Sequence, residues 1–416
     1  MKHRVVITGI GVCSPVGGTA AECWDNLLAG KSGIGPVTLF DASTLTVRIG
    51  GEAKGLDPAG LAREFPEVVD ESDRKIRLGL TAASQAIRDA ALEREDLRAA
   101  ALFVGVSLES FPLERIEMAA GADELIRALA GAEGVRLQTP LDRLAQIMGG
   151  HYGFHGGQIT NCSACAAGSQ VVGEAFRRLR AGWCEVAVTG AADSVLNPLG
   201  LGGFSLLRIL STENERPQQA CRPFDATRQG TVLGEGAAFL VLETLTHARH
   251  RGARIYAEVL GYGTSLDAYR ATDPEPGGKG AVRSMKRVLA DAGLQAEQVD
   301  GVNAHGTGTP KNDIAETFAL KEALGPRAFA IPVTANKSMT GHLIAASGAL
   351  EAAASAMALH TGWMPPTINL DHPDPQCDLD YVTEGKRVFD GRVVLSNSFG
   401  FGGQNATLIF GKYIIS

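Results

Sequence analysis

The sequence predicts a mixed α/β fold in which strands and helices alternate through both halves of the chain. Short apolar segments, the size of buried strands, are repeatedly followed by longer segments whose apolar residues recur every three or four positions. The chain also has 51 glycines among 416 residues, which indicates many tight turns between strands and helices. We therefore expect layers of helices packed on sheets.

The order of the expected elements repeats along the chain, although the residues themselves do not. In the first half we expect strands over residues 4–11, 101–106, 159–160, 185–190 and 237–243, helices over 20–28, 73–92 and 171–180, and a mostly helical stretch over 112–150. In the second half we expect strands over 255–261, 299–304, 392–396 and 406–410, and helices over 281–292, 313–324 and 345–359. The chain becomes charged near residues 248–253 and then restarts, so we predict two units, 1–252 and 253–416.

Composition limits the classes of function. A hydrophobic content of 45% and a charged content of 20% are ordinary for a folded protein. No apolar run reaches the roughly 20 residues of a membrane helix, and the N-terminal apolar run breaks into a glycine turn too early for a signal peptide. We therefore expect a cytoplasmic protein with reduced thiols at its seven scattered cysteines. A net charge of −7 argues against general affinity for nucleic acid.

Residues 159–170 contain the best candidate for a nucleophile. A short apolar strand runs into a series of small residues, and a helix is predicted to follow from the periodic apolar residues between Val171 and Leu179. Cys165 lies at or just before the first turn of that helix. Because free N–H groups and the helix dipole stabilise a thiolate there, we expect a lowered pKa for Cys165.

Two other interpretations of Cys165 stay open at this point. Buried cysteines often serve only as small apolar side chains. The Cys162-x-x-Cys165 spacing is also typical of redox or metal pairs. A metal site is disfavoured, because no second cysteine pair or histidine cluster lies nearby in the sequence.

Three later stretches share one character, since each presents polar groups from a glycine-rich turn at the end of a strand. They are residues 303–310, 336–342 and 397–405. Each pattern is weak alone, because a lone histidine is often structural and a lone lysine is usually at the surface. Together with residues 163–168, however, they resemble, in order and spacing, the elongating type I and type II branch of the β-ketoacyl-acyl carrier protein synthases.

The resemblance extends from Val5 to Phe410, essentially the whole chain. It implies a thiolase-like fold, in which two pseudo-symmetric halves form αβαβα layers, usually as a dimer. It also implies a decarboxylative Claisen condensation. Cys165 would accept an acyl group from a carrier-protein thioester, and His305 and His342 would donate hydrogen bonds to the malonyl thioester oxygen as carbon dioxide leaves.

The resemblance assigns further roles near the nucleophile. The backbone N–H groups of Cys165 and Phe401 would form an oxyanion hole for the acyl carbonyl. Phe401 would also gate the pocket, with the flanking glycines supplying backbone freedom. Lys337 would position and polarise the site, with Glu351 as its expected ion partner.

The substrate would arrive on the phosphopantetheine arm of the carrier protein, and no bound cofactor or metal is implied. Three threonines would hydrogen-bond that arm: Thr307, Thr309 and Thr272. Four cationic residues are candidates for docking the acidic carrier protein: Arg74, Lys75, Arg77 and Arg208. The threonines are also compatible with turn stabilisation, and each cation with an ordinary solvated surface charge.

Some residues favour one branch of the family, and others depart from its common pattern. Initiating synthases pair cysteine with histidine and asparagine, whereas two histidines and a lysine here favour elongation. Thiolases have a second cysteine where this chain has Phe401. The segment 139–157 and the Asn161-Cys162 pair depart from the common pattern, and residues 311–313 lean toward polyketide enzymes.

Three hypotheses remain from the sequence. The first is an elongating condensing enzyme for fatty acids or a polyketide, as a homodimer or as a heterodimer with a chain-length-factor-like subunit. The second is an acyltransferase or thiolase-like enzyme that does not decarboxylate. The third is a catalytically idle partner subunit, which the presence of Cys165 disfavours.

Overall fold

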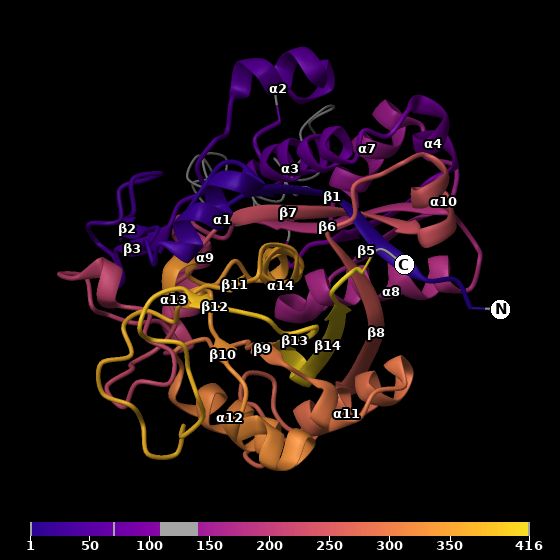
Figure 1. Cartoon of the computed structure of the whole chain (residues 1–416). Helices are drawn as coiled ribbons and strands as arrows, with labels where there is room; N and C mark the ends of the chain where they lie inside the picture. Colours follow the sequence, from indigo (N-terminus) through magenta and orange to yellow (C-terminus); the bar gives the residue numbers. More distant parts are fainter. Residues whose placement is uncertain (1, 70, 109–139, 415–416) are drawn as a thin grey trace.

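The structure, a computed structural model, describes residues 2–69, 71–108 and 140–414 (Figure 1). One ten-stranded sheet runs through these residues. In spatial order its strands are β10 (Val333–Thr334), β9 (Gly301–Asn303), β13 (Val393–Gly400), β14 (Gln404–Gly411), β8 (Ala257–Leu266), β1 (Val5–Cys13), β7 (Gly236–Thr244), β6 (Val186–Asp193), β4 (Ala101–Gly105) and β5 (Gln158–Asn161).

The sheet consists of two five-stranded units with the same topology. The unit β1-β7-β6-β4-β5 and the unit β8-β14-β13-β9-β10 each pair their first three strands antiparallel and their last three parallel. The units join where β1 pairs antiparallel with β8. The expected repeat is therefore present in the fold. The division at 252/253 stays a prediction, and it falls between α10 (Leu245–His250) and β8.

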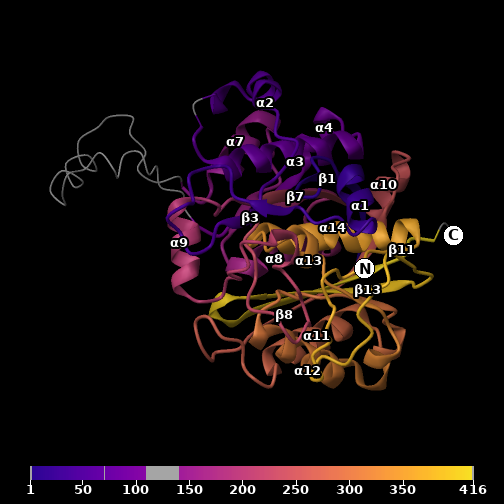
Figure 2. The ribbon, with the colours of Figure 1, turned by 90° about the vertical axis from the view of Figure 1, so that its left-hand side faces the viewer.

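The helices form three layers around the two units of the sheet (Figure 1, Figure 2). Helix α3 (Arg74–Ala90) covers β1 and β7 on one side, and α11 (Lys279–Ala292) covers β8 and β14 on the other. Between the units lie α8 (Ala167–Arg180) and α14 (Ala345–Thr361). This order of layers is the αβαβα arrangement expected of a thiolase-like fold.

The central layer requires small residues. Helix α14 is buried on nearly all sides, which is why its sequence is dominated by alanine rather than by an apolar stripe. A Cβ atom on Gly168 would lie 2.6 Å from the carbonyl oxygen of Ala345, so glycine is needed where α8 meets α14. This close approach brings the starts of the two helices together at the seam between the halves.

The remaining elements lie outside the ten-stranded sheet and the four helices described above. The helices are α1 (Ala20–Leu28), α2 (Pro58–Glu64), α4 (Arg94–Ala99), α7 (Arg143–Tyr152), α9 (Pro198–Leu206), α12 (Pro310–Leu324) and α13 (Lys337–Thr340), and the small strands are β2 (Ile34–Pro36), β3 (Ile49–Gly51), β11 (Trp363–Met364) and β12 (Arg387–Val388). All expected strands and helices within the described residues are present, whereas residues 112–139 of the expected helical stretch lie outside them. No helix in the described ranges has the length and apolar character needed to cross a membrane.

Candidate active site

Cys165 lies in η2 (Ala164–Ala166), one turn of 3-10 helix between the end of β5 and the start of α8. Ala164 has a φ of 48°, in the left-handed region that residues with a side chain seldom adopt, so the chain turns sharply before the cysteine. The turn is braced by Asn161, whose side-chain oxygen accepts hydrogen bonds from the backbone N–H and hydroxyl of Ser163 at 2.9 and 2.6 Å. The thiol, 4% exposed, thereby lines a cavity of about 380 Å³.

The expected lowering of the Cys165 pKa is wrong for the enzyme without substrate. Burial raises the pKa of this thiol to about 11. The backbone N–H of Phe401, the Lys337 charge and the backbone N–H of Cys165 itself all oppose that rise but do not overcome it. The physical reason is that the pocket removes water from the thiolate, and two N–H groups replace only part of its hydration.

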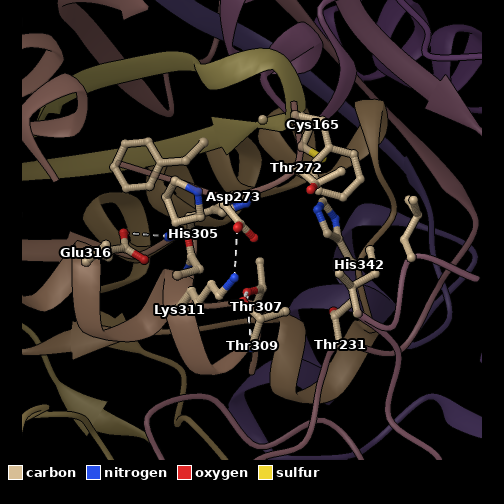
Figure 3. A pocket seen from close by; sticks show the side chains of 18 of the residues that line it. Cys165, Thr231, Thr272, Asp273, His305, Thr307, Thr309, Lys311, Glu316 and His342 are labelled. Carbon is tan, nitrogen blue, oxygen red and sulfur yellow. Dashed lines mark hydrogen bonds and ion pairs between the residues drawn. The ribbon is translucent and has the colours of Figure 1, made fainter. Parts of the chain in front are cut away.

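Two histidines face the same cavity from the other half of the chain (Figure 3). His305 follows strand β9, and His342 follows helix α13. Their ring centroids lie 5.3 Å apart at an interplanar angle of 83°, and both side chains are buried. The structure thus brings Cys165, His305 and His342 to one cavity, although they are far apart in the sequence.

Hydrogen bonds determine which nitrogen of His342 carries the proton. The Nδ1 atom accepts the backbone N–H of Ile344 at 3.1 Å and lies 2.9 Å from the Ser347 hydroxyl. Because a backbone N–H can only donate, Nδ1 has no proton, and the neutral ring carries its proton on Nε2. His342 can therefore donate from Nε2.

The buried Lys337 determines in a similar way which ring nitrogen of His305 carries the proton. The Lys337 Nζ atom lies 3.2 Å from His305 Nδ1 and donates to the His305 carbonyl oxygen at 2.7 Å. An ammonium only donates, so Nδ1 accepts and the His305 proton also lies on Nε2. The expected ion pair between Lys337 and Glu351 is present and buried.

Electrostatics keep both imidazoles neutral. Burial and the Lys337 charge hold the pKa of His305 and of His342 well below its usual range. Burial also raises the pKa of Glu351 to about 7, although Lys337 opposes that rise. The site therefore presents two uncharged N–H donors beside a thiol, which suits stabilisation of negative charge developing on a bound oxygen.

Phe401 closes one side of the cavity. Its ring stacks on Phe204 of α9, with centroids 6.2 Å apart and an interplanar angle of 24°. A Cβ atom on Gly400 would lie 3.2 Å from the backbone nitrogen of Cys165, so this loop passes directly against Cys165. Gly402, with a φ of 76°, donates its N–H to the carbonyl of Ala271 at 2.7 Å, which ties the Phe401 loop to the rim of the cavity.

The three expected threonines all line the cavity and differ in exposure. Thr307 is buried, Thr309 is half-buried and Thr272 is exposed. The hydroxyls of Thr307 and Thr309 lie 2.9 Å apart, so at least one of them has acceptor capacity left for a ligand.

Comparison with known proteins agrees with this geometry. The model of the β-ketoacyl synthase N-terminal domain matches residues 2–248, and that of the C-terminal domain matches residues 256–371. The chain belongs to the β-ketoacyl synthase family. It is accordingly an acyltransferase, and its reaction class is β-ketoacyl synthesis.

Curated relatives match this β-ketoacyl synthase from end to end. The 3-oxoacyl-[acyl-carrier-protein] synthase 2 of Synechocystis sp. is 42% identical over 418 residues, and that of Coxiella burnetii is 40% identical, each covering 99% of both chains. Among solved structures, the ishigamide ketosynthase/chain length factor has 35% identity and a TM-score of 0.89 with full coverage of both chains. A β-ketoacyl synthase from Burkholderia phymatum has 32% identity and a TM-score of 0.86, again with full coverage of both chains.

Two residues of this β-ketoacyl synthase site were not anticipated from the sequence. Glu316, on α12, accepts the backbone N–H groups of His305 and Gly306, each at 2.8 Å, and Asn397 donates to the same carboxylate at 3.2 Å. Ser347 fixes the His342 tautomer. No clear sequence signal marks Glu316, because Asn312, Asp313 and Thr317 are also polar residues on the buried side of α12, and nothing local marks Ser347.

The structure also corrects the expected docking residues. Lys75 is 0% exposed and donates to Asp73 and to the carbonyl of Leu108, so its assignment as a docking residue is wrong. Arg74 pairs with the buried Glu235 at 2.7 Å, and Arg77 is half-buried in a separate shallow groove beside α2. Arg208 alone of the four is exposed and lines the active-site cavity.

Proposed function

We propose that this protein catalyses the decarboxylative condensation of an acyl group held on Cys165 with a malonyl thioester carried on a phosphopantetheine arm. The observation that supports this most is the convergence of one thiol and two Nε2–H imidazoles on one buried cavity. In this proposal the acyl donor and the malonyl donor both arrive on an acyl carrier protein, as the names of the relatives indicate for those proteins.

Acylation is the first step. The Cys165 sulfur attacks the acyl thioester carbonyl, a tetrahedral oxyanion forms, and the carbon–sulfur bond to the carrier breaks, releasing its thiol with the proton from Cys165. The backbone N–H groups of Cys165 and Phe401 face the sulfur and are suitably placed to donate hydrogen bonds to the oxyanion. The raised pKa of the free thiol means that this step depends on those donors.

Condensation is the second step. The bond between the malonyl carboxylate and its α-carbon breaks, carbon dioxide leaves, and the electron pair forms an enolate whose oxygen accepts hydrogen bonds from His305 and His342. The enolate carbon then attacks the acyl carbonyl on Cys165, and the carbon–sulfur bond breaks to regenerate the thiolate. Neutral imidazoles serve better here than charged ones, because they can donate without protonating the enolate.

Lys337 is a positioning residue in this proposal. Its three N–H groups are used by His305 Nδ1, the His305 carbonyl and Glu351, so it fixes the ring and its tautomer rather than contacting substrate. Phe401 serves as the gate, because its glycine-flanked loop lines the cavity and its ring packs on Phe204 of α9.

A second subunit is also proposed. Strand β5 forms one edge of the ten-stranded sheet, and Gln158 and Ile159 on it are exposed. Such an edge can pair with the same edge of another chain. The partner is a second copy or a chain-length-factor-like subunit, and native mass spectrometry of the isolated and co-expressed protein distinguishes the two.

Intact-protein mass spectrometry tests the proposed reaction. Incubation with acyl carrier protein thioesters is expected to add one acyl group to the enzyme and none to the Cys165→Ala variant, and malonyl carrier protein is then expected to release carbon dioxide. An adduct without malonyl-dependent release supports the non-decarboxylating acyltransferase. The absence of any adduct across a range of chain lengths supports the idle partner subunit.

A further inference from the structure

The rim of the active-site cavity carries a cluster of charges that the proposed chemistry does not use. Lys311, at the start of α12, donates from Nζ to Asp273 Oδ2 at 2.7 Å, and Arg270 approaches the same oxygen at 3.3 Å. Asp273 and Lys311 both line the cavity. Figure 3 shows the two side chains pointing toward each other, with Thr307 and Thr309 beside Lys311. We call Arg270, Asp273 and Lys311 the rim cluster.

The rim cluster lies at the outer end of the cavity. Residues at the inner end, Cys165 and His305 among them, are buried. The side chains of Lys311 and Arg270 are 66% and 63% exposed, and that of Asp273 is 24% exposed. An extended arm whose thioester lies at Cys165 therefore has its far end near the rim cluster.

Cations outnumber carboxylates at the rim, although Asp267, held by Asn405 and the Glu275 N–H, also lines the cavity. One carboxylate is shared by two cations, so the rim cluster keeps a net positive charge. The exposed Arg208 also lines the cavity, and within the described residues its guanidinium has no hydrogen-bond or ion-pair partner. This excess of positive charge favours the binding of an anionic group at the mouth of the cavity.

We propose that the rim cluster is a phosphate subsite for the pantetheine arm, in which the phosphate replaces Asp273 on Lys311 and Arg270. This inference rests on the proposed function, because it takes the thioester end of the arm to lie at Cys165. An exposed ion pair is weak, so exchanging its anion costs little. A phosphate offers more negative charge and more acceptor oxygens than one carboxylate, so Lys311 and Arg270 bind it more strongly.

Asp273 has a definite role in this exchange. It occupies the cationic subsite when no arm is bound, and it competes with the phosphate when one arrives. The carboxylate thus sets how strongly the rim prefers a phosphorylated arm over an unphosphorylated one. A merely structural ion pair, which only ties the loop around Asp273 to α12, would not change that preference.

Calorimetric titration with 4′-phosphopantetheine and with pantetheine tests the proposal on the complete protein. The measured quantity is the ratio of the two dissociation constants. We expect the wild-type protein to bind the phosphorylated arm about fivefold more tightly, as befits exposed charge-assisted contacts. The Lys311→Ala variant is expected to bring the ratio close to one, and Asp273→Asn to increase it above the wild-type value.

Lys279→Ala is the matched control. Lys279 is also an exposed lysine, and it also pairs with a carboxylate of the same loop, Glu275, at 3.9 Å, but it does not line the cavity. Its removal is expected to leave the ratio at the wild-type value. Because Lys311→Ala and Asp273→Asn break the same ion pair yet should move the ratio in opposite directions, a general loss of folding cannot imitate the result.

The proposal is overturned if Lys311→Ala keeps the wild-type ratio, or if Asp273→Asn lowers it. Binding is measured without turnover, so a protein that shows these ratios but forms no acyl-Cys165 retains the phosphate subsite and loses the proposed function. Comparing Lys311→Ala on malonyl carrier protein and malonyl-coenzyme A identifies the source of the phosphate. A loss of kcat/KM with the carrier protein alone assigns it to the carrier arm, and equal losses assign it to either source.

Discussion

The two halves of the molecule place different chemistry at equivalent positions. In the first half, strand β5 leads through η2 to the central helix α8, and Cys165 lies in that connection. In the second half, strand β10 leads through α13 to the central helix α14, and His342 lies there. Each connection has one residue with a side chain in the left-handed region, Ala164 with a φ of 48° and Ile344 with a φ of 47°.

The difference between the halves lies in what surrounds each turn. The thiol is met by backbone N–H groups, which oppose but do not overcome the rise in its pKa on burial. The imidazole is met by Ser347 and the Ile344 N–H, which determine its tautomer, and by burial, which keeps it neutral. A residue at positive φ therefore lies beside the proposed nucleophile in one half and near the proposed hydrogen-bond donor in the other.

We expect the largest effect on activity from variants that remove one of the two imidazoles. We expect His305→Ala and His342→Ala each to lower malonyl-dependent carbon dioxide release by about 10²–10³-fold, because each removes one donor to the developing enolate. Acylation of Cys165 should persist, since its oxyanion is served by the backbone. Trapped carbon dioxide and intact mass measure the two steps separately.

His360→Ala is the control for the imidazole variants. His360 lies on α14, the helix that follows His342. Its ring packs against Tyr256, with the ring centroids 5.0 Å apart, and it does not line the cavity. Carbon dioxide release should stay at the wild-type rate. Wild-type release from both His305→Ala and His342→Ala would show that the second half does not carry the decarboxylation.

The pH dependence of alkylation tests the state of the thiol in the first half. Because the Cys165 pKa is raised to about 11, the thiolate fraction is small at neutral pH and grows as the pH increases. The rate of iodoacetamide labelling at Cys165, measured by peptide mass spectrometry, should rise about tenfold per pH unit, roughly 100-fold between pH 7 and 9. A plateau below pH 9 would contradict the raised pKa and restore the expectation from the helix start.

The Glu316→Gln variant tests how much the hydrogen bonds between Glu316 and the His305 loop contribute to stability. The Glu316→Gln variant can satisfy only one of the backbone N–H groups of His305 and Gly306 with its amide oxygen, and its amide group faces the other. We expect a loss of about 1–3 kcal/mol in the free energy of unfolding, from urea denaturation. Glu322→Gln, on the exposed side of the same helix, should change it by less than about 0.5 kcal/mol.

The smallest effect concerns the left-handed turn of the first half. Ala164→Gly removes the cost of placing a side chain at positive φ but makes the unfolded chain more flexible, so a net gain of about 0.5 kcal/mol is expected. Ala166, two residues after Ala164, has a φ of −90°, and Ala166→Gly should destabilise by about 0.5–1 kcal/mol. Thermal denaturation of the two variants compares them, and equal losses would show that the turn at Ala164 is not strained.

Much of the architecture follows from local pattern. Apolar periodicity predicts α3 and α8, because the period of an amphipathic helix is visible in consecutive residues. The alanine-rich composition of residues 345–359 predicts α14. The strand expected before residues 336–342 is β10, but the sequence does not give its range, since two residues carry no usable period. Helix α9 was also missed, and its exposed Leu206 explains why: no polar face marks it as a surface helix.

The sequence by itself determined the element order, the four motifs with Cys165, His305 and His342, and the pairing of Lys337 with Glu351. Only the tertiary structure decided that Lys75 is buried, that the thiol is desolvated and that Asp273 meets Lys311 at the rim. The reason is physical. Turns and periodicity depend on neighbours along the chain, whereas the exposure and protonation of a side chain depend on segments that folding brings to it from elsewhere.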